Sequence, residues 1–201
     1  MEKDQDNSTK EPIAEYGPYS YADYLRWELE DRVEIIKGRH YKMNAAPKRL
    51  HQKLSLHIAT ELYQFLKGKA CEVYEAPFDV RLPVKSLKNE EIFTVVQPDI
   101  CVICDPGKLD EAGCLGAPDL IVEILSQGNN KKELLYKYEV YQESGVQEYW
   151  IIHPDEQTLL VYTLTAGKYV PSRLFTSGDI VKSDCIERFT LDLESLFKEM
   201  K

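Results

Sequence analysis

Two nearly continuous apolar runs, separated by a helical segment, constrain the fold of this chain more than any other feature. The runs are DLIVEIL (119–125) and VQEYWIIH (146–153), and the segment between them ends at Gly145. Such runs are typical of central strands that are covered on both faces. A strand, a helix and a second strand in this order form a parallel pair with a right-handed crossover. We therefore predict a βαβ unit over 119–153 within an α/β fold.

The rest of the chain alternates between strand-like and helix-like patterns. Leu50, Leu54 and Ile58 recur at helical spacing in one long amphipathic stretch, and short apolar-rich runs around a glycine indicate β-hairpins. The expected elements are helices over 20–30 and 48–67 and hairpins that turn at Lys37-Gly38 and Ala166-Gly167. We also expect a strand or hairpin over 71–82, a loop over 83–93, a strand over 94–104, a long loop or a loop with one helical turn over 105–118, and a strand near 179–182.

Length and composition point to a single domain. The chain has 201 residues, of which 43% are hydrophobic and 29% are charged, as is usual for a globular domain. Residues 1–18 are polar and acidic and contain no apolar segment, so we expect a disordered tail there and one domain over 19–201. No apolar run approaches the ~20 residues of a membrane span. These features predict a cytoplasmic protein without a membrane partner.

Five cysteines stand at positions 71, 101, 104, 114 and 185. An odd number without a regular spacing, in a chain with no export signal, favours reduced thiols. Cys101, Cys104 and Cys114 could suggest a zinc site. However, CVIC lies in an apolar run, where residues i and i+3 point to opposite faces of a strand. We therefore favour buried thiols over zinc.

One of the apolar runs carries a carboxylate that needs an explanation. A buried carboxylate such as Glu123 is costly unless it is paired, hydrogen-bonded or bound to a metal ion. Asp99 opens another predicted strand, and neighbouring strands lie about 5 Å apart. If the two strands are neighbours, both carboxylates could hold Mg²⁺ or Mn²⁺, with the Ile124 carbonyl as a further oxygen ligand.

Other charged residues near this run have two interpretations. Asp119 lies ~13 Å from Glu123 along the same strand face, and we interpret it as a turn or cap residue. Glu133, Lys137 and Tyr141 form one stripe on the helix between the strands. The stripe could be a solvated surface pair, or it could direct Lys137 at the two acids. The spacing alone does not decide between these alternatives.

Four motifs in the sequence together resemble those of a known family. QPDI, GAPDLIVEILS, the E-x-x-x-K-x-x-x-Y pattern and GVQEYWIIHP occur in the same order and with the same gaps as in the bacterial Uma-two family, which belongs to the PD-(D/E)XK nuclease superfamily. The resemblance extends from RVEIIKGRHYKM to about residue 162. It implies a restriction-endonuclease-like fold, in which helices flank a mixed central β-sheet and an N-terminal β-hairpin is added.

The resemblance also implies which residues form the site. Asp99 matches the acid of the PD motif and Glu123 matches the second acid. Leu125 stands where the usual lysine would be, and Lys137 on the following helix matches the displaced lysine. Glu34 matches a further acid near the metal ion. Supporting polar positions are matched by His51, Ser126 and Tyr141.

Three positions depart from the family pattern. Gln127 follows Ser126 where the family has proline, Glu133 replaces an aspartate before the helix lysine, and His153 replaces an aspartate after the YW strand. These departures leave the set of two acids and one lysine intact. They weaken inference about the substrate more than inference about the fold.

The resemblance implies a metal-dependent endonuclease that hydrolyses DNA phosphodiester bonds, with a possible homodimer. The alternative is a catalytically weak or inactive nuclease-fold module that binds nucleic acid or protein. The net charge of −9 favours the alternative, because dedicated DNA binders usually carry a basic surface. The intact acids and lysine favour the enzyme. In a third interpretation the acids are structural and Lys137 is a solvated helix charge.

Overall fold

The computed structural model describes residues 18–27, 32–43, 48–126 and 131–198, with the side chains of residues 131–133 excluded. The tail predicted over 1–18 therefore lies almost entirely outside the described residues. No helix within the described part of the chain is long and apolar enough to cross a membrane.

The central sheet confirms the predicted βαβ unit. Its strand order is β12-β11-β10-β9-β6-β3, and β13 also pairs with β11. Strands β9 and β10 are parallel, and the other pairs are antiparallel. The strands are β3 (Glu72–Glu75), β6 (Ile100–Ile103), β9 (Leu120–Ile124), β10 (Glu148–His153), β11 (Thr158–Thr165), β12 (Lys168–Pro171) and β13 (Phe175–Thr176). Helix α3 (Lys131–Ser144) connects β9 to β10 and ends before Gly145, whose φ of 89° suits glycine.

A second sheet is built mostly from the N-terminal half of the chain. Its order is β2-β1-β5-β4-β8-β7. The strands are β1 (Val33–Ile36), β2 (Arg39–Lys42), β4 (Val80–Arg81), β5 (Val95–Val96), β7 (Leu109–Asp110) and β8 (Gly113–Leu115). The predicted hairpin at Lys37-Gly38 is confirmed, with positive φ at both residues.

Two predictions about residues 94–118 were wrong. The segment 94–104 is two strands in two different sheets, β5 and β6, rather than one strand. Pro98 between them has no N–H for a strand ladder, which explains the break. In the loop over 105–118, the 3₁₀ helix Pro106–Lys108 agrees with the alternative of one helical turn, but the β7–β8 hairpin was not predicted. A second 3₁₀ helix spans Asn89–Glu91.

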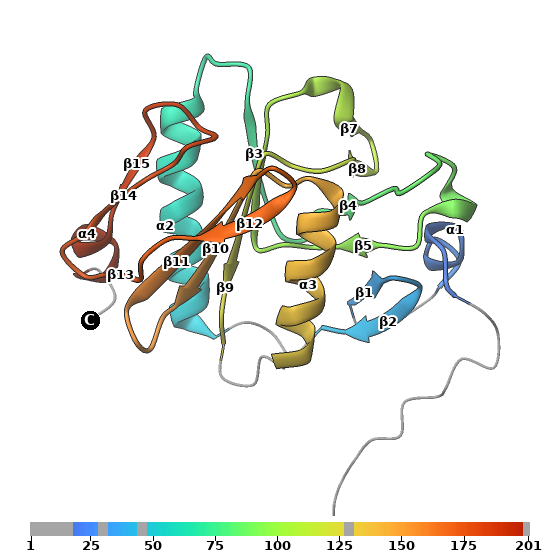
Figure 1. Cartoon of the computed structure of the whole chain (residues 1–201), viewed down its shortest axis with the longest axis horizontal. Helices are drawn as coiled ribbons and strands as arrows, with labels where there is room; N and C mark the ends of the chain where they lie inside the picture. The colour runs from blue at the N-terminus through green and yellow to red at the C-terminus, as the bar shows by residue number, and fades with distance from the viewer. Residues whose placement is uncertain (1–17, 28–31, 44–47, 127–130, 199–201) are drawn as a thin grey trace, which may run out of the picture.

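Helices cover both faces of the central sheet (Figure 1). Helix α2 (Arg49–Leu66) and helix α4 (Leu193–Lys198) pack on one face, where Leu54 and Ile58 belong to the same buried cluster as Val122 and Phe197. Helix α3 and the second sheet cover the other face, where Ile121 lies in a separate cluster. Because side chains alternate along a strand, Glu123 points to the same face as Ile121, toward α3.

The observed helices agree with the predicted ones to different degrees. Helix α2 has nearly the bounds predicted for it. The helix expected over 20–30 is only α1 (Tyr21–Tyr24), although the predicted capping box of Ser20 and Asp23 is present; residues 28–31 lie outside the described part. The final strand prediction is confirmed by β14 (Ile180–Lys182), which pairs with β15 (Thr190–Asp192). The hairpin at Ala166-Gly167 joins β11 to β12 as predicted.

The prediction that all cysteines are reduced was wrong for one pair. Cys71 and Cys104 form a disulfide. The register of β3 and β6 pairs residue 72 with residue 103, which places these two cysteines opposite each other one position further along. Cys101, Cys114 and Cys185 are free. Since Cys104 is disulfide-bonded and Cys101 and Cys114 are buried, the thiols near CVIC behave as packing residues.

Candidate active site

Strands β6 and β9 bring Asp99 and Glu123 together as the sequence suggested. Ile100 pairs with Val122 in the antiparallel register, so residues 99 and 123 are the next opposing positions. Directly opposite side chains have Cβ atoms about 4.5–5.5 Å apart. The Ile124 N–H donates to Asp99 Oδ2 at 2.7 Å, which fixes the Asp99 carboxylate against the end of β9.

Lys137 reaches this acidic site from α3. Its Nζ lies 3.0 Å from Glu123 Oε1 and 3.0 Å from Glu34 Oε1. Glu34 is on β1 of the second sheet, and its Oε1 also accepts the Gln97 N–H at 2.8 Å. All three charged side chains are buried, with exposed fractions of 1% for Glu34, 7% for Glu123 and 4% for Lys137. The geometry therefore excludes a solvated surface role for Lys137.

Tyr141 lies one helical turn beyond Lys137 and shares its face of α3. Its hydroxyl donates to Glu123 Oε1 at 2.8 Å, and the side chain is fully buried. Glu123 Oε1 thus accepts from both a lysine and a tyrosine on the same helix. Glu133, the third member of the predicted stripe, has a side chain outside the described residues.

The buried charges shift each other's protonation. Burial raises the pKa of Glu123 to about 7; Lys137 opposes this rise, and Asp99 and Glu34 add to it. For Lys137, burial acts to lower the pKa, but the carboxylates of Glu123 and Glu34 outweigh it and raise the pKa well above its ordinary value. Lys137 is therefore a permanent cation at neutral pH, beside a carboxyl group that can take up a proton.

His51 has a closer place in the site than its sequence position indicated. Its Nε2 lies 3.2 Å from Asp99 Oδ2. Burial lowers the pKa of His51, but the hydrogen bond and charge of Asp99 outweigh burial, so that the pKa is raised. The sequence signal was available: His51 precedes Leu54 by three residues and Ile58 by seven, which places it on the buried face of α2.

Asp119 has the structural role that the sequence suggested. Its Oδ2 accepts the Cys104 N–H at 2.7 Å and its Oδ1 accepts from Gln147 Nε2 at 2.9 Å. These bonds tie the start of β9 to the end of β6 and the start of β10. Ser126 is half-buried just beyond β9.

The donors at this site suit a hard divalent cation. Glu34 and Glu123 contact the ammonium of Lys137, and the charge of Asp99 acts on Glu123 as well, so an ion beside Asp99 and Glu123 would offset the excess negative charge. Within the described ranges, no three His, Cys, Asp or Glu side chains form a metal-binding group. A bound ion would therefore rely on two carboxylates, the Ile124 carbonyl and water, which is a usual arrangement for Mg²⁺.

Comparison with known proteins decides the family. The Uma2 family model, described as "Putative restriction endonuclease", matches residues 21–194. The chain belongs to the Uma2 family. This membership confirms the resemblance found in the sequence and supports a nuclease function in general terms. The homodimer expected from the same resemblance stays a prediction.

A solved structure supports the fold of this Uma2 protein. It is the crystal structure of "a putative nuclease belonging to DUF820" from Anabaena variabilis ATCC 29413. The two chains are 21% identical and superpose with a TM-score of 0.71, over 92% of this chain and 100% of the other. The predicted restriction-endonuclease-like α/β fold is thereby confirmed. Among curated proteins, none matches the chain significantly.

Tyr141 and Tyr149 allow a matched test of the hydrogen bond to Glu123 in this Uma2 protein. Both side chains are fully buried, but the Tyr149 hydroxyl has no hydrogen-bond partner among the described residues. We expect Tyr141→Phe to lower the free energy of unfolding by about 1–3 kcal/mol, because Glu123 loses a donor. Tyr149→Phe should be neutral or stabilising. Equal losses in urea denaturation of the two variants would contradict this assignment.

The raised pKa of Glu123 predicts a pH dependence of stability. The folded state binds the Glu123 proton more tightly than the ordinary value of 4.5 implies, so the contribution is fully present below about pH 4.5 and is lost as pH rises through about 7. In EDTA, the free energy of unfolding of wild type minus that of Glu123→Gln should therefore fall over this range. A difference that stays constant or grows with pH would contradict the raised pKa.

Proposed function

We propose that this chain is a Mg²⁺- or Mn²⁺-dependent endonuclease that hydrolyses phosphodiester bonds in DNA. The observation that carries the proposal is the meeting of a half-buried Asp99 with the buried Glu123 and Lys137, through the register of two strands and the packing of one helix. Unpaired, such carboxylates would be costly to bury. Membership of the Uma2 family supports the same class of reaction.

Asp99, Glu123 and the Ile124 carbonyl are the groups that would hold the ion. Two hydrogen bonds pre-organise them: Ile124 N–H to Asp99 and Tyr141 O–H to Glu123. Both acids are held at the adjoining ends of two core strands, and rigid elements place ligands more accurately than loops do. When bound, the ion would lower the pKa of a coordinated water and stabilise negative charge on the phosphate.

Lys137 is proposed to orient the attacking water or a phosphate oxygen. Its ammonium has three donors, and its partners among the described residues are Glu34 and Glu123. A third donor can therefore point toward the substrate, where it would stabilise developing charge. Glu34 was predicted as a catalytic and metal-binding acid; its contacts with Lys137 and the Gln97 N–H favour a positioning role through Lys137.

The proposal is tested by incubating the full chain with supercoiled plasmid and with single-stranded DNA, in Mg²⁺, Mn²⁺ or EDTA. We expect cleavage of DNA in either metal ion and none in EDTA. Calorimetric titration with Mn²⁺ serves as a separate readout of metal binding. Metal binding without cleavage of any substrate would overturn the enzymatic proposal and favour an inactive nuclease-fold module.

A further inference from the structure

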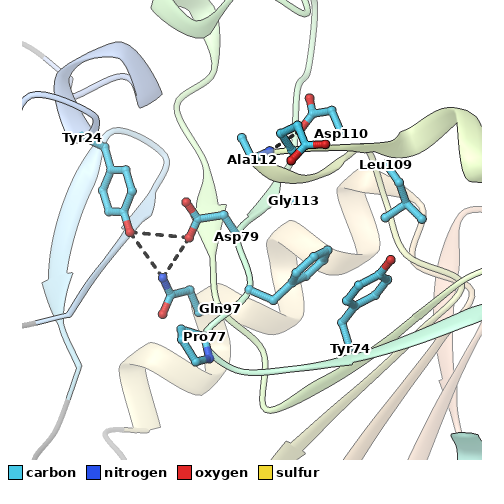
Figure 2. Close-up of a pocket in the computed structure, with 11 residues that line it drawn as sticks. Tyr24, Tyr74, Pro77, Asp79, Gln97, Leu109, Asp110, Ala112 and Gly113 are labelled. Atoms are coloured by element: carbon cyan, nitrogen blue, oxygen red, sulfur yellow. Dashed lines mark hydrogen bonds between the residues drawn. The ribbon is translucent and has the colours of Figure 1, made fainter.

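A pocket of about 530 Å³ is lined in part by Gln97 and by none of the acids of the candidate active site. The Gln97 backbone N–H donates to Glu34, whereas its side chain lines the pocket. Figure 2 shows Tyr24, Asp79 and Gln97 converging on one side of this pocket, with Tyr74 across from them and Asp110 at its rim. Neither the proposed metal ligands nor Lys137 lines this pocket.

Aromatic rings form one wall of the pocket. Tyr74 and Phe78 are stacked with their centroids 4.2 Å apart and their planes 11° apart. Tyr24 contributes a third ring from α1, on the opposite wall beside Asp79 and Gln97. All three rings are half-buried, so they offer apolar faces to an occupant without closing the pocket. The faces of aromatic rings carry negative potential and attract cations.

The opposite wall carries a carboxylate whose partners are uncharged. Asp79 Oδ1 accepts from Gln97 Nε2 at 2.8 Å and from the Tyr24 hydroxyl at 3.5 Å. Burial and Asp79 raise the pKa of Tyr24 to about 12, so Tyr24 stays neutral. Among the described residues Asp79 has no ion-pair partner, because the nearby Arg81 pairs with Asp110 instead.

The charge of the residues that line the pocket favours a cationic occupant. Asp79, Asp110 and Glu111 line it, and the Arg81 guanidinium offsets one of these carboxylates. Gln97 is more than nine-tenths buried, and its Oε1 has no hydrogen-bond donor in the part of the chain that is described. The wall therefore holds a carboxylate without a cationic partner, beside a buried amide oxygen that has no donor.

We propose that this pocket binds an organic cation, a guanidinium or alkylammonium group, between the Tyr74–Phe78 stack and Asp79. The cation would face the rings and donate to the Asp79 carboxylate in a charge-assisted bond. The excess of carboxylates disfavours a phosphate-bearing ligand such as the DNA substrate itself.

The test compares two probes of equal shape, butylguanidinium and uncharged butylurea, by calorimetric titration of the full chain in EDTA. We expect saturable binding of butylguanidinium and at least roughly tenfold weaker binding of butylurea, from the loss of one charge-assisted contact. This comparison uses wild type alone, so it stands even if a variant fails to fold. It also needs no nuclease activity.

Variants then locate the site. Asp79→Asn should weaken butylguanidinium binding by roughly tenfold or more, and Tyr74→Leu should weaken it by removing half of the aromatic stack. Glu61→Gln, an exposed change of the same charge on α2, should leave binding unchanged. Any of four results would overturn the proposal: no saturable binding, equal binding of the two probes, stronger binding of the nucleoside cytidine than of butylguanidinium, or wild-type affinity in folded Asp79→Asn.

Discussion

Replacing Lys137 by methionine is expected to destabilise the fold by about 3–5 kcal/mol, which is the usual cost of removing one partner from a buried charge group. Lys137 compensates two buried carboxylates, with Nζ 3.0 Å from Glu34 and 3.0 Å from Glu123. Methionine has a similar length, so the cost would come from the lost charge more than from a cavity. The two carboxylates would be left facing each other without a cation.

The charge explanation can be separated from a packing explanation by a second change. Glu34→Gln in the Lys137→Met background removes one uncompensated carboxylate and should restore part of the lost stability. Urea denaturation of wild type, the two single variants and the double variant gives the coupling energy between the positions. Additive losses, with no recovery in the double variant, would show that Lys137 and Glu34 do not interact as the structure indicates.

Glu123→Gln is expected to lower DNA cleavage by on the order of 100-fold or more, because the amide cannot supply the negative charge that a metal ligand and its transition state require. The substitution keeps the side-chain shape, and the amide oxygen can still accept from Tyr141. Glu34 remains as a partner for Lys137. The variant should therefore fold, so lost cleavage could be attributed to chemistry.

A second buried glutamate provides a matched control. Glu148 has an exposed fraction of 1% and accepts from the Ser183 hydroxyl and the Asp184 N–H. It anchors the segment after β14 and lies apart from the acids and the lysine of the site. Glu148→Gln should therefore lose stability and keep cleavage, the reverse of Glu123→Gln. Loss of cleavage in both folded variants would show that the effect at Glu123 is not specific.

Periodicity and strand rules predicted the βαβ unit, and that Asp99 and Glu123 meet if their strands are neighbours, whereas the role of Lys137 came from the family resemblance. The apolar runs at 119–125 and 146–153 required a βαβ unit, and the helix between them could carry Lys137 over the sheet. The meeting of Asp99 and Glu123 needed only that β6 and β9 be adjacent, and their register confirms this. The resemblance to the Uma2 family identified which acids belong to the site.

Contacts that depend on the pairing of strands far apart in the chain could not be predicted from the sequence. The break in 94–104 is different, because Pro98 was a local sign of it, although the apolar residues on both sides make the segment look continuous. The disulfide depends on the register of β3 and β6, which no local pattern gives. For His51, the apolar face of α2 indicated burial and the resemblance indicated a place near the site, but no local pattern gave its contact with Asp99 at the end of β6.

The most direct test of the account is nicking of supercoiled plasmid in Mg²⁺, measured in parallel for wild type, Glu123→Gln and Glu148→Gln, with an EDTA control. The account predicts cleavage by wild type and by folded Glu148→Gln, and none by Glu123→Gln or by any protein in EDTA. Equal cleavage by wild type and Glu123→Gln, or cleavage that persists in EDTA, would contradict a metal-dependent site built on Glu123.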